Sequence, residues 1–205
     1  MNILLIPTYF ANILHWCALV KSNQVSFEVC DSYQKQTYRN RTHIYSANGT
    51  LALSIPVVYS QNNRQMYRDI EIYNNDKWQN VHWKSLISAY GASPFFEFYK
   101  DDLAPLFHTK QKFLMDFNFK CFETLLHCLD IEIDYLKTTS FEREITQNKD
   151  MRDCTNVRKE KQYNFVNYTQ VFEKKHGFIS NLSILDLLFN EGPNTVMYLN
   201  NQSIS

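Results

Sequence analysis

Short apolar stretches predict the strands of this chain. Residues 3–6 are a continuous apolar run, so residues 2–6 are typical of a buried strand, and residues 24–31 alternate between apolar and polar side chains. The sequence YRDIEIY at residues 67–73 predicts another strand, with Ile70 and Ile72 directed inward. All three runs are short, which favours a small sheet.

Apolar residues that recur every three or four positions predict helices between and after these strands. Asn75 or Asp76 is the expected N-cap of one helix, and Asn181 is the expected N-cap of the last. On the first of these, Trp83 and Ile87 should face the core. The predicted helices are residues 11–21, residues 75–91, a short helix after Pro94, residues 111–133 and residues 182–190.

Two segments lack these patterns. Residues 142–161 are crowded with charge and show little periodicity, so we expect an exposed loop or mobile insert there. The tail after Asn200 is expected to fray. The remaining elements predict one α+β domain over residues 1–205, with a small, mainly antiparallel sheet packed by four to five helices.

The antiparallel part of that prediction rests on Asn48-Gly49, which stands between two strand-like runs. This dipeptide favours a type I′ hairpin turn, in which both central residues take a positive φ. With these two residues at the centre of the turn, Ile44 faces Leu53 and Thr42 faces Ile55. The side-chain period of two then directs Arg39, Arg41 and His43 to the opposite face, beside small residues, while Tyr38 and Asn40 share the apolar face.

Charge is distributed unevenly along the chain. Lysine plus arginine and aspartate plus glutamate number 21 each, so the net charge is zero, but residues 32–68 hold five cations and no acid. The predicted hairpin gathers Arg39 and Arg41, with Lys35 if the strand extends backward, into an open positive shelf. An ordinary solvent-exposed strand accounts for the same composition. Asp31 and Glu28 precede the cations as either charge partners or a base.

Several classes of protein are disfavoured. The apolar first twenty residues lack the basic start of a signal peptide and are interrupted by Pro7, so we expect a cytoplasmic protein without membrane insertion. The five cysteines form no CxxC pair, and no close Cys or His pairs suggest zinc. With four glycines and no phosphate-binding or dinucleotide motif, we expect no cofactor.

Five stretches of the sequence carry a family resemblance: PTYFANILHW, DSYQKQTYRNR, NGTLALSIPV, WQNVHWKSLISAYGASPFFEFY and SILDLLFNEG. Together they resemble the WbqC-like protein family, more narrowly its short branch found in Bacteroidetes. The resemblance covers most of residues 4–107 and the last forty residues. It implies a gene cluster for surface polysaccharide of the O-antigen type, and no secure activity follows from it. In many members the first strand ends in Gln-Pro, where this chain has Ile6-Pro7.

The predicted shelf suits a phosphorylated ligand. Arginine offers paired donors to phosphate or carboxylate, and lysine adds a point charge. Arg39 and Arg41, two residues apart on a strand, would be separated by roughly 6.6–6.8 Å, a spacing that suits two phosphates. The predicted substrate-binding residues are Tyr33, Lys35, Gln36, Arg39, Asn40, Arg41 and His43.

His82, His15 and Glu28 are the candidates for proton transfer. A lone helical histidine is more often structural, and Glu28 is better suited to pairing with an arginine than to acting as a base. The resulting hypothesis is an enzyme that binds a phosphorylated or nucleotide-linked sugar and acts by group transfer. The alternatives are a non-catalytic binding or assembly protein and a nucleic-acid binder, which the neutral net charge disfavours. The oligomeric state stays open.

Overall fold

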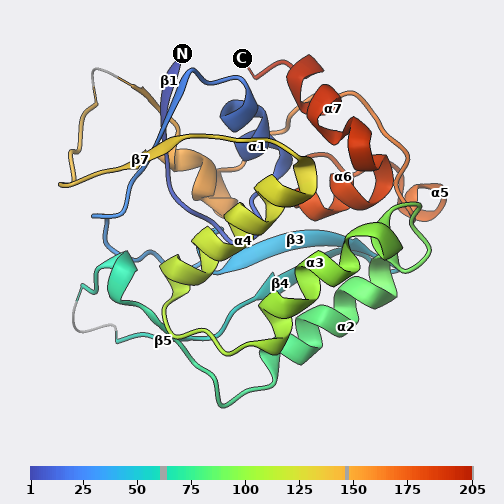
Figure 1. Ribbon diagram of the computed structural model, residues 1–205, viewed down its shortest axis with the longest axis horizontal. Coiled ribbons are helices and arrows are strands. Elements are labelled where there is room, and N and C mark those ends of the chain that lie inside the picture. The colour runs from blue at the N-terminus through green and yellow to red at the C-terminus, as the bar shows by residue number, and fades with distance from the viewer. Residues whose placement is uncertain (61–63, 146–147, 205) are drawn as a thin grey trace.

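The computed structural model describes residues 1–60, 64–145 and 148–204. Its main sheet has four parallel strands in the order β7-β2-β1-β8 (Figure 1). The α+β class is confirmed, but the prediction of a mainly antiparallel sheet is wrong. Parallel partners lie far apart in the sequence, so short-range patterns reveal the strands without revealing how they pair. The strands are β1 (Asn2–Leu5), β2 (Gln24–Phe27), β7 (Tyr135–Lys137) and β8 (Lys149–Asp150).

The first two strands and the helix between them, α1 (Ile13–Val20), form a parallel β-α-β unit. Asn12 caps α1, because its side chain accepts a hydrogen bond from the backbone N–H of His15. A second cap comes from Asn181, whose Oδ1 accepts the N–H of Leu14 at 2.8 Å. The strand predicted at residues 2–6 and the helix predicted at residues 11–21 are therefore both present, with slightly shorter bounds.

One face of the sheet carries the aromatic part of the core. Ile3 and Leu5 pair with Val25 and Phe27, and all four side chains are buried. The helix α4 (Leu114–Leu129) covers this face, since the rings of Phe119 and Phe122 lie 5.4 and 5.2 Å from that of Phe27. On the other face Leu136 is 56% exposed.

The hairpin at residues 41–54 is present, but its register differs from the prediction. Strands β3 (Arg41–Ser46) and β4 (Gly49–Ser54) pair Ser46 with Gly49, which puts Ala47 and Asn48 at the centre of the turn. Only Gly49 takes a positive φ, of 93°, so the turn is not type I′. Ile44 therefore faces Leu51, and Thr42 faces Leu53. The register error is two residues, which leaves the side chains within β3 and β4 on their predicted faces.

A second helical layer covers the hairpin. In Figure 1, α2 (Trp78–Tyr90) and α3 (Phe96–His108) lie side by side on one flank of β3 and β4. Lys77, rather than Asn75 or Asp76, occupies the N-cap position of α2. The prediction that Ile87 faces the core is wrong, because its side chain is 45% exposed.

The C-terminal region packs against α1. Ser183, rather than Asn181, caps α6 (Ile184–Glu191), which leads through η4 (Gly192–Asn194) into α7 (Thr195–Asn201). Gln202 is buried, and its Oε1 accepts the N–H of Val166 at 2.8 Å, so the expectation of fraying directly after Asn200 is wrong at this residue. The shorter elements are β5 (Val57–Val58), η1 (Tyr67–Asp69), β6 (Glu71–Ile72) and α5 (Glu173–His176).

The charged segment at residues 142–161 contributes to the fold. It supplies β8, η2 (Arg152–Thr155) and η3 (Val157–Lys159), and Met151 and Thr155 are buried. Residues 146–147 of this segment lie outside the described residues. One short edge strand and two turns of 3-10 helix leave no periodic apolar pattern in the sequence, so the sequence predicts a loop here instead.

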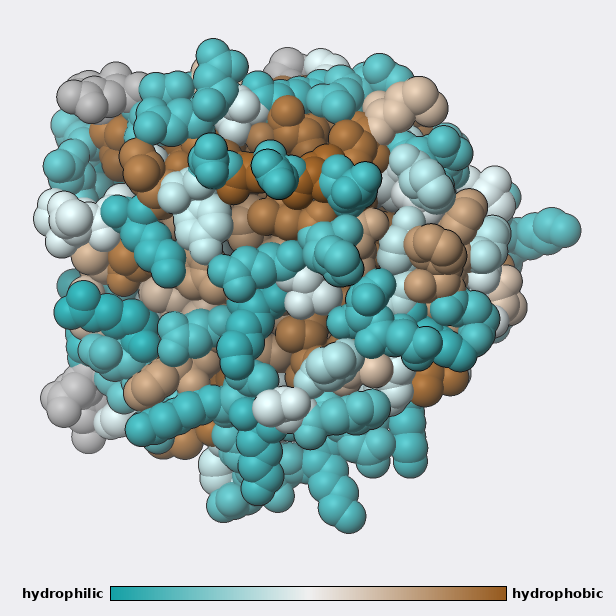
Figure 2. All heavy atoms as spheres, viewed as in Figure 1, coloured by the Kyte–Doolittle hydropathy of each residue, from teal (hydrophilic) through white to brown (hydrophobic). Residues whose placement is uncertain are grey.

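Hydrophilic side chains cover most of the face seen in Figure 2, with apolar residues in strips between them. None of the helices in the described ranges is long and apolar enough to cross a lipid bilayer.

Gly192 is placed where the backbone and the packing both favour glycine. Its φ is +52°, and an added Cβ would lie 2.5 Å from the ring of Phe95. We expect Gly192→Ala to lower the free energy of unfolding by about 2–4 kcal/mol in urea denaturation. Gly49→Ala is the matched control, since its φ is +93° and no atom lies within 4 Å of the added Cβ. Its cost should be about 1 kcal/mol, and equal losses in the two variants would show that the contact with Phe95 contributes nothing.

Candidate functional site

The carboxyl ends of the parallel strands meet at one edge of the sheet. Glu28 follows β2, Thr138 follows β7 and Arg152 lies two residues after β8. Ligands of parallel sheets commonly bind at this edge, because the chain leaves each strand there and can present side chains. A cavity of about 480 Å³ adjoins it, lined by Ile6 at the end of β1 and by the polar residues Asp31, Arg39, Arg143, Asp150, Arg152 and Asp153.

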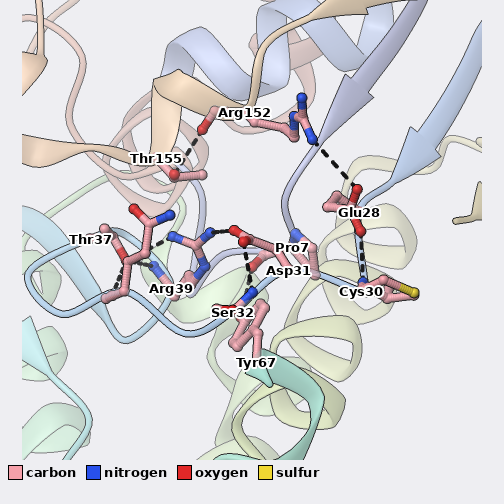
Figure 3. Close-up of polar contacts among 12 residues, drawn as sticks. Pro7, Glu28, Cys30, Asp31, Ser32, Thr37, Arg39, Tyr67, Arg152 and Thr155 are labelled. Atoms are coloured by element: carbon pink, nitrogen blue, oxygen red, sulfur yellow. Dashed lines mark hydrogen bonds and ion pairs between the residues drawn. The ribbon is translucent and has the colours of Figure 1, made fainter. Parts of the chain in front are cut away.

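Arg39 is the most unusual residue of this cavity. Its side chain is 1% exposed and forms an ion pair with Asp31, as the partner interpretation of Asp31 predicted (Figure 3). The guanidinium also lies 5.4 Å from the ring centre of Tyr67, and Nη1 is 3.4 Å from the Thr37 hydroxyl. Among the described residues its Nε has no hydrogen-bond partner. The Nε–H of Arg39 is therefore a donor that no atom in this part of the chain uses.

Helix α4 holds the backbone of Arg39 in place. Asn118, fully buried on that helix, donates from Nδ2 to the carbonyl of Arg39 at 2.7 Å and to the hydroxyl of Tyr67. The Tyr67 hydroxyl in turn donates to the carbonyl of Pro7 at 2.8 Å. Three distant segments thus hold the arginine in one position relative to the end of β1.

Arg152, after β8, contacts Glu28, after β2. Its Nη1 is 3.6 Å from Oε2 of Glu28, and its Nε and Nη2 bind Asp150 at 3.0 and 2.7 Å (the first contact is drawn in Figure 3). The other carboxylate oxygen of Glu28 accepts the N–H of Cys30 and the hydroxyl of Thr138. Glu28 is fully buried, and no hydrogen bond to its Oε2 comes from the described part of the chain.

Arg152 also favours the ionised form of the Asp150 carboxylate. Partial burial of the Asp150 carboxylate raises its pKa, but hydrogen bonds from Arg152 outweigh this and leave the pKa below its ordinary value. Asp150 is therefore ionised at neutral pH, and so the cavity brings fixed acceptors and fixed donors together. No group of three or more His, Cys, Asp or Glu side chains within residues 1–60, 64–145 and 148–204 is arranged to hold a metal ion.

The open shelf of cations is a wrong prediction. The residues before β3 form turns, with Gln36 at φ +58°, so no strand runs back to Lys35. Arg39 points inward to Asp31, whereas Arg41 stays on β3 and donates from Nε to the Ser54 hydroxyl at 3.1 Å. Strand periodicity does not apply to residues in turns, so the two arginines do not share a face.

The other predicted binding residues are scattered. Lys35 is exposed above the ring of Tyr59, and Gln36 is exposed in its turn. Tyr33 is buried against Tyr59 and Tyr67, and burial raises the pKa of its phenol to about 12. Asn40 donates to the carbonyl of Ile55. His43 lines a different cleft, on the far side of the Thr37–Asn40 turn.

The two histidines proposed for catalysis lie in the core rather than among the lining residues of the cavity. His82 is 3% exposed, with Nδ1 2.9 Å from the hydroxyl of Tyr9 and its ring edge-on to Trp78. Burial lowers the pKa of His82 to about 4 and that of His15 to about 3. Both are neutral at pH 7, and the structure does not bring either together with Arg39.

The residues missed by the sequence reasoning come from the charged segment. Arg152 and Asp150 contribute much of the polar lining, and Thr138 holds Glu28. The only signal was the charge of residues 142–161 itself, which is also typical of a solvated loop.

The fold and the site define an α+β protein with a polar, arginine-containing cavity at the carboxyl edge of a parallel sheet. The profile of the WbqC-like protein family matches residues 7–167 and 158–198, and the chain belongs to this family. It is also 32% identical over 79 residues to the uncharacterized protein Rv1507c of Mycobacterium tuberculosis. That match covers 38% of this chain and only 34% of the relative. No solved structure matches the chain.

The contrast between the two arginines can be measured. Arg39→Met leaves Asp31 without its buried partner, so we expect a loss of about 3 kcal/mol in the free energy of unfolding. Arg41→Met removes only an exposed hydrogen bond and should cost less than about 1 kcal/mol. Urea denaturation of both variants gives the comparison, and equal small losses would show that the buried pair does not stabilise the fold.

The buried histidines predict a loss of stability in acid. Their folded pKa values lie below the unfolded value of 6.5, so their contribution is complete above pH 6.5 and is lost as pH falls toward about 4 for His82 and about 3 for His15. When pH falls from 7 to 5, the free energy of unfolding of His82→Gln should decrease by about 2 kcal/mol less than that of the unmodified protein. Gly49→Ala, destabilised for another reason, should follow the unmodified pH profile. A parallel profile for His82→Gln would show that His82 does not resist protonation.

Proposed function

We propose that this protein binds a phosphorylated or nucleotide-linked sugar in the cavity at the carboxyl edge of its parallel sheet. The observation that carries the proposal is the buried guanidinium of Arg39 with its unpartnered Nε, on a cavity that also contains Arg143 and Arg152. Arginine donors recognise phosphate oxygens in pairs, and a preformed donor needs little rearrangement to bind an anion.

The acids of the cavity support a sugar as the other part of the ligand. Asp31, Asp150 and Asp153 line the same space as the arginines, so the lining is not uniformly positive. Carboxylates accept hydrogen bonds from sugar hydroxyls, while the arginines bind phosphate. A cavity of about 480 Å³ falls in the range of small-molecule sites. The surface-polysaccharide setting that the family resemblance implies is consistent with this ligand, and we place the activity in the cytoplasm.

Binding is better supported than proton transfer by histidine. His82 and His15 are enclosed in the core, which leaves Glu28 as the predicted acid–base residue at the edge of the sheet. Among the described residues its Oε2 has no hydrogen-bond partner, and it lies 3.6 Å from Nη1 of Arg152. Glu28 lines a neighbouring cleft beside Thr138 and is connected to this cavity through Arg152. A non-catalytic sugar-phosphate binder therefore fits the cavity better than a group-transfer enzyme that uses Glu28.

Calorimetric titration with UDP-glucose, UDP-N-acetylglucosamine and glucose 1-phosphate tests the proposal. At least one of these should bind, and Arg143→Gln should weaken it about tenfold, because it removes a charge-assisted hydrogen bond. Arg143 is the best position, since its side chain is exposed at the cavity and its loss should not disturb the core. Arg41→Gln is the matched control on β3 and should bind as the unmodified protein does.

Two results would contradict the proposal. The first is the absence of binding with all three compounds. The second is an equal loss of affinity in Arg41→Gln and Arg143→Gln, which would indicate a diffuse charge effect rather than a site. Salt-sensitive binding of a single-stranded oligonucleotide in place of the sugars would support the nucleic-acid alternative.

A further inference from the structure

A second polar cleft, of about 540 Å³, lies on the other side of the Thr37–Asn40 turn. Tyr38 lines this cleft, although the next residue, Arg39, lines the cavity at the sheet edge. The cleft also receives His43 from β3 and Glu160 from the charged segment. The lining residues fall within 38–50, 160–164 and 178–182, so three segments that are far apart in the sequence meet here.

The orientation of Asn181 sets the hydrogen bonds of this cleft. Its Oδ1 accepts the N–H of Leu14, a group that can only donate, so the amide cannot be reversed. Its Nδ2 therefore donates to Oε1 of Glu160. Asn181 thereby connects the N-terminus of α1 to Glu160 and fixes one oxygen of this carboxylate.

Tyr38 occupies the other oxygen of the same carboxylate. Its hydroxyl donates to Oε2 of Glu160 at 2.5 Å. Burial raises the pKa of Glu160 above its ordinary value, although the hydrogen bonds from Tyr38 and Asn181 oppose this effect. Both oxygens accept hydrogen bonds, which is the pattern of an ionised carboxylate.

The protonation of His43 follows from the single proton of the tyrosine. Nδ1 of His43 lies 3.2 Å from the Tyr38 hydroxyl, whose proton is already directed to Glu160. The hydrogen bond between them therefore requires the proton on Nδ1, and Nε2 keeps its lone pair. Burial, and to a smaller extent the charge of Arg41, lower the pKa of His43 and favour this neutral form.

The rest of the lining suits a neutral ligand with many hydroxyl groups. Gln162 and Asn164 offer amide donors and acceptors. Tyr163 offers an aromatic face and is held in place by stacking on Phe165, with ring centres 5.5 Å apart. The charged residues that line this cleft are Glu160, which is already paired, and Lys161.

We propose that this cleft is a second binding site, for a neutral carbohydrate, in which Nε2 of His43 accepts a hydrogen bond from a sugar hydroxyl. The pair formed by Tyr38 and Glu160 positions His43 as an acceptor, and Tyr163 packs against a sugar ring. Such a ligand carries no phosphate. The site is therefore independent of the phosphosugar site proposed at the sheet edge.

The protonation pattern is tested by nitrogen-15 NMR of the histidine side chains. The unmodified protein should show His43 with its proton on Nδ1. Tyr38→Phe removes the acceptor of that proton and should abolish this preference, whereas Lys84→Gln, at an exposed position on α2, should retain it. A proton on Nε2 in the unmodified protein would overturn the assignment.

Carbohydrate binding is tested by NMR titration with cellobiose, maltose and chitobiose. We expect at least one disaccharide to shift the His43 signals at millimolar concentrations. His43→Phe and Tyr163→Ala should each weaken binding about tenfold, as followed by backbone amide signals, while Lys84→Gln should leave it unchanged. Thermal unfolding verifies that both variants are folded, and an unfolded variant is replaced by His43→Gln or Tyr163→Leu. No shift with any of the three disaccharides, or equal affinity in the folded variants, would overturn the proposal.

Discussion

The ion pair between Arg39 and Asp31 determines how the carboxyl edge of the sheet is built. A buried guanidinium without a partner is costly in a low-dielectric interior, so the chain must bring acceptors to it. Asp31 supplies the charge, and Asn118 and Tyr67 fix the backbone and the apolar face. These contacts connect the loop after β2 to α4 and η1. The cavity at this edge exists because these elements meet around one arginine.

The turn that carries Arg39 also separates two different chemical environments. On one side the lining combines three arginines with three aspartates, and on the other it consists mainly of amides, aromatic rings and a neutral histidine. Adjacent residues in a turn point in different directions, which allows one short segment to contribute to both. The charged segment at residues 142–161 holds this turn in place. The backbone carbonyl of Thr155 accepts the N–H of Tyr38, and Glu160 accepts a hydrogen bond from the Tyr38 hydroxyl.

The sequence predicted the local elements better than their assembly. The strand at residues 2–6, the helices around Trp83 and Leu125, and the partnership of Arg39 with Asp31 follow from patterns within a few residues of each other. The pairing of β7 and β8 with the sheet and the role of Arg152 did not follow, because they depend on contacts between residues more than a hundred positions apart. The shelf failed for a smaller reason. Gln36 takes a left-handed conformation, which ends the predicted strand and turns Arg39 into the interior.

The short strand β8 has a consequence for how this protein responds to its ligands. It pairs with β1 through only two residues, Lys149 and Asp150, yet Arg152 and Asp150 lie at its carboxyl end. A ligand that binds these side chains would also hold β8 against the sheet. By mass action, such a ligand would stabilise the folded sheet by the same free energy with which the docked strand favours binding. Ligand binding in the cavity and the pairing of β8 with β1 are therefore thermodynamically coupled.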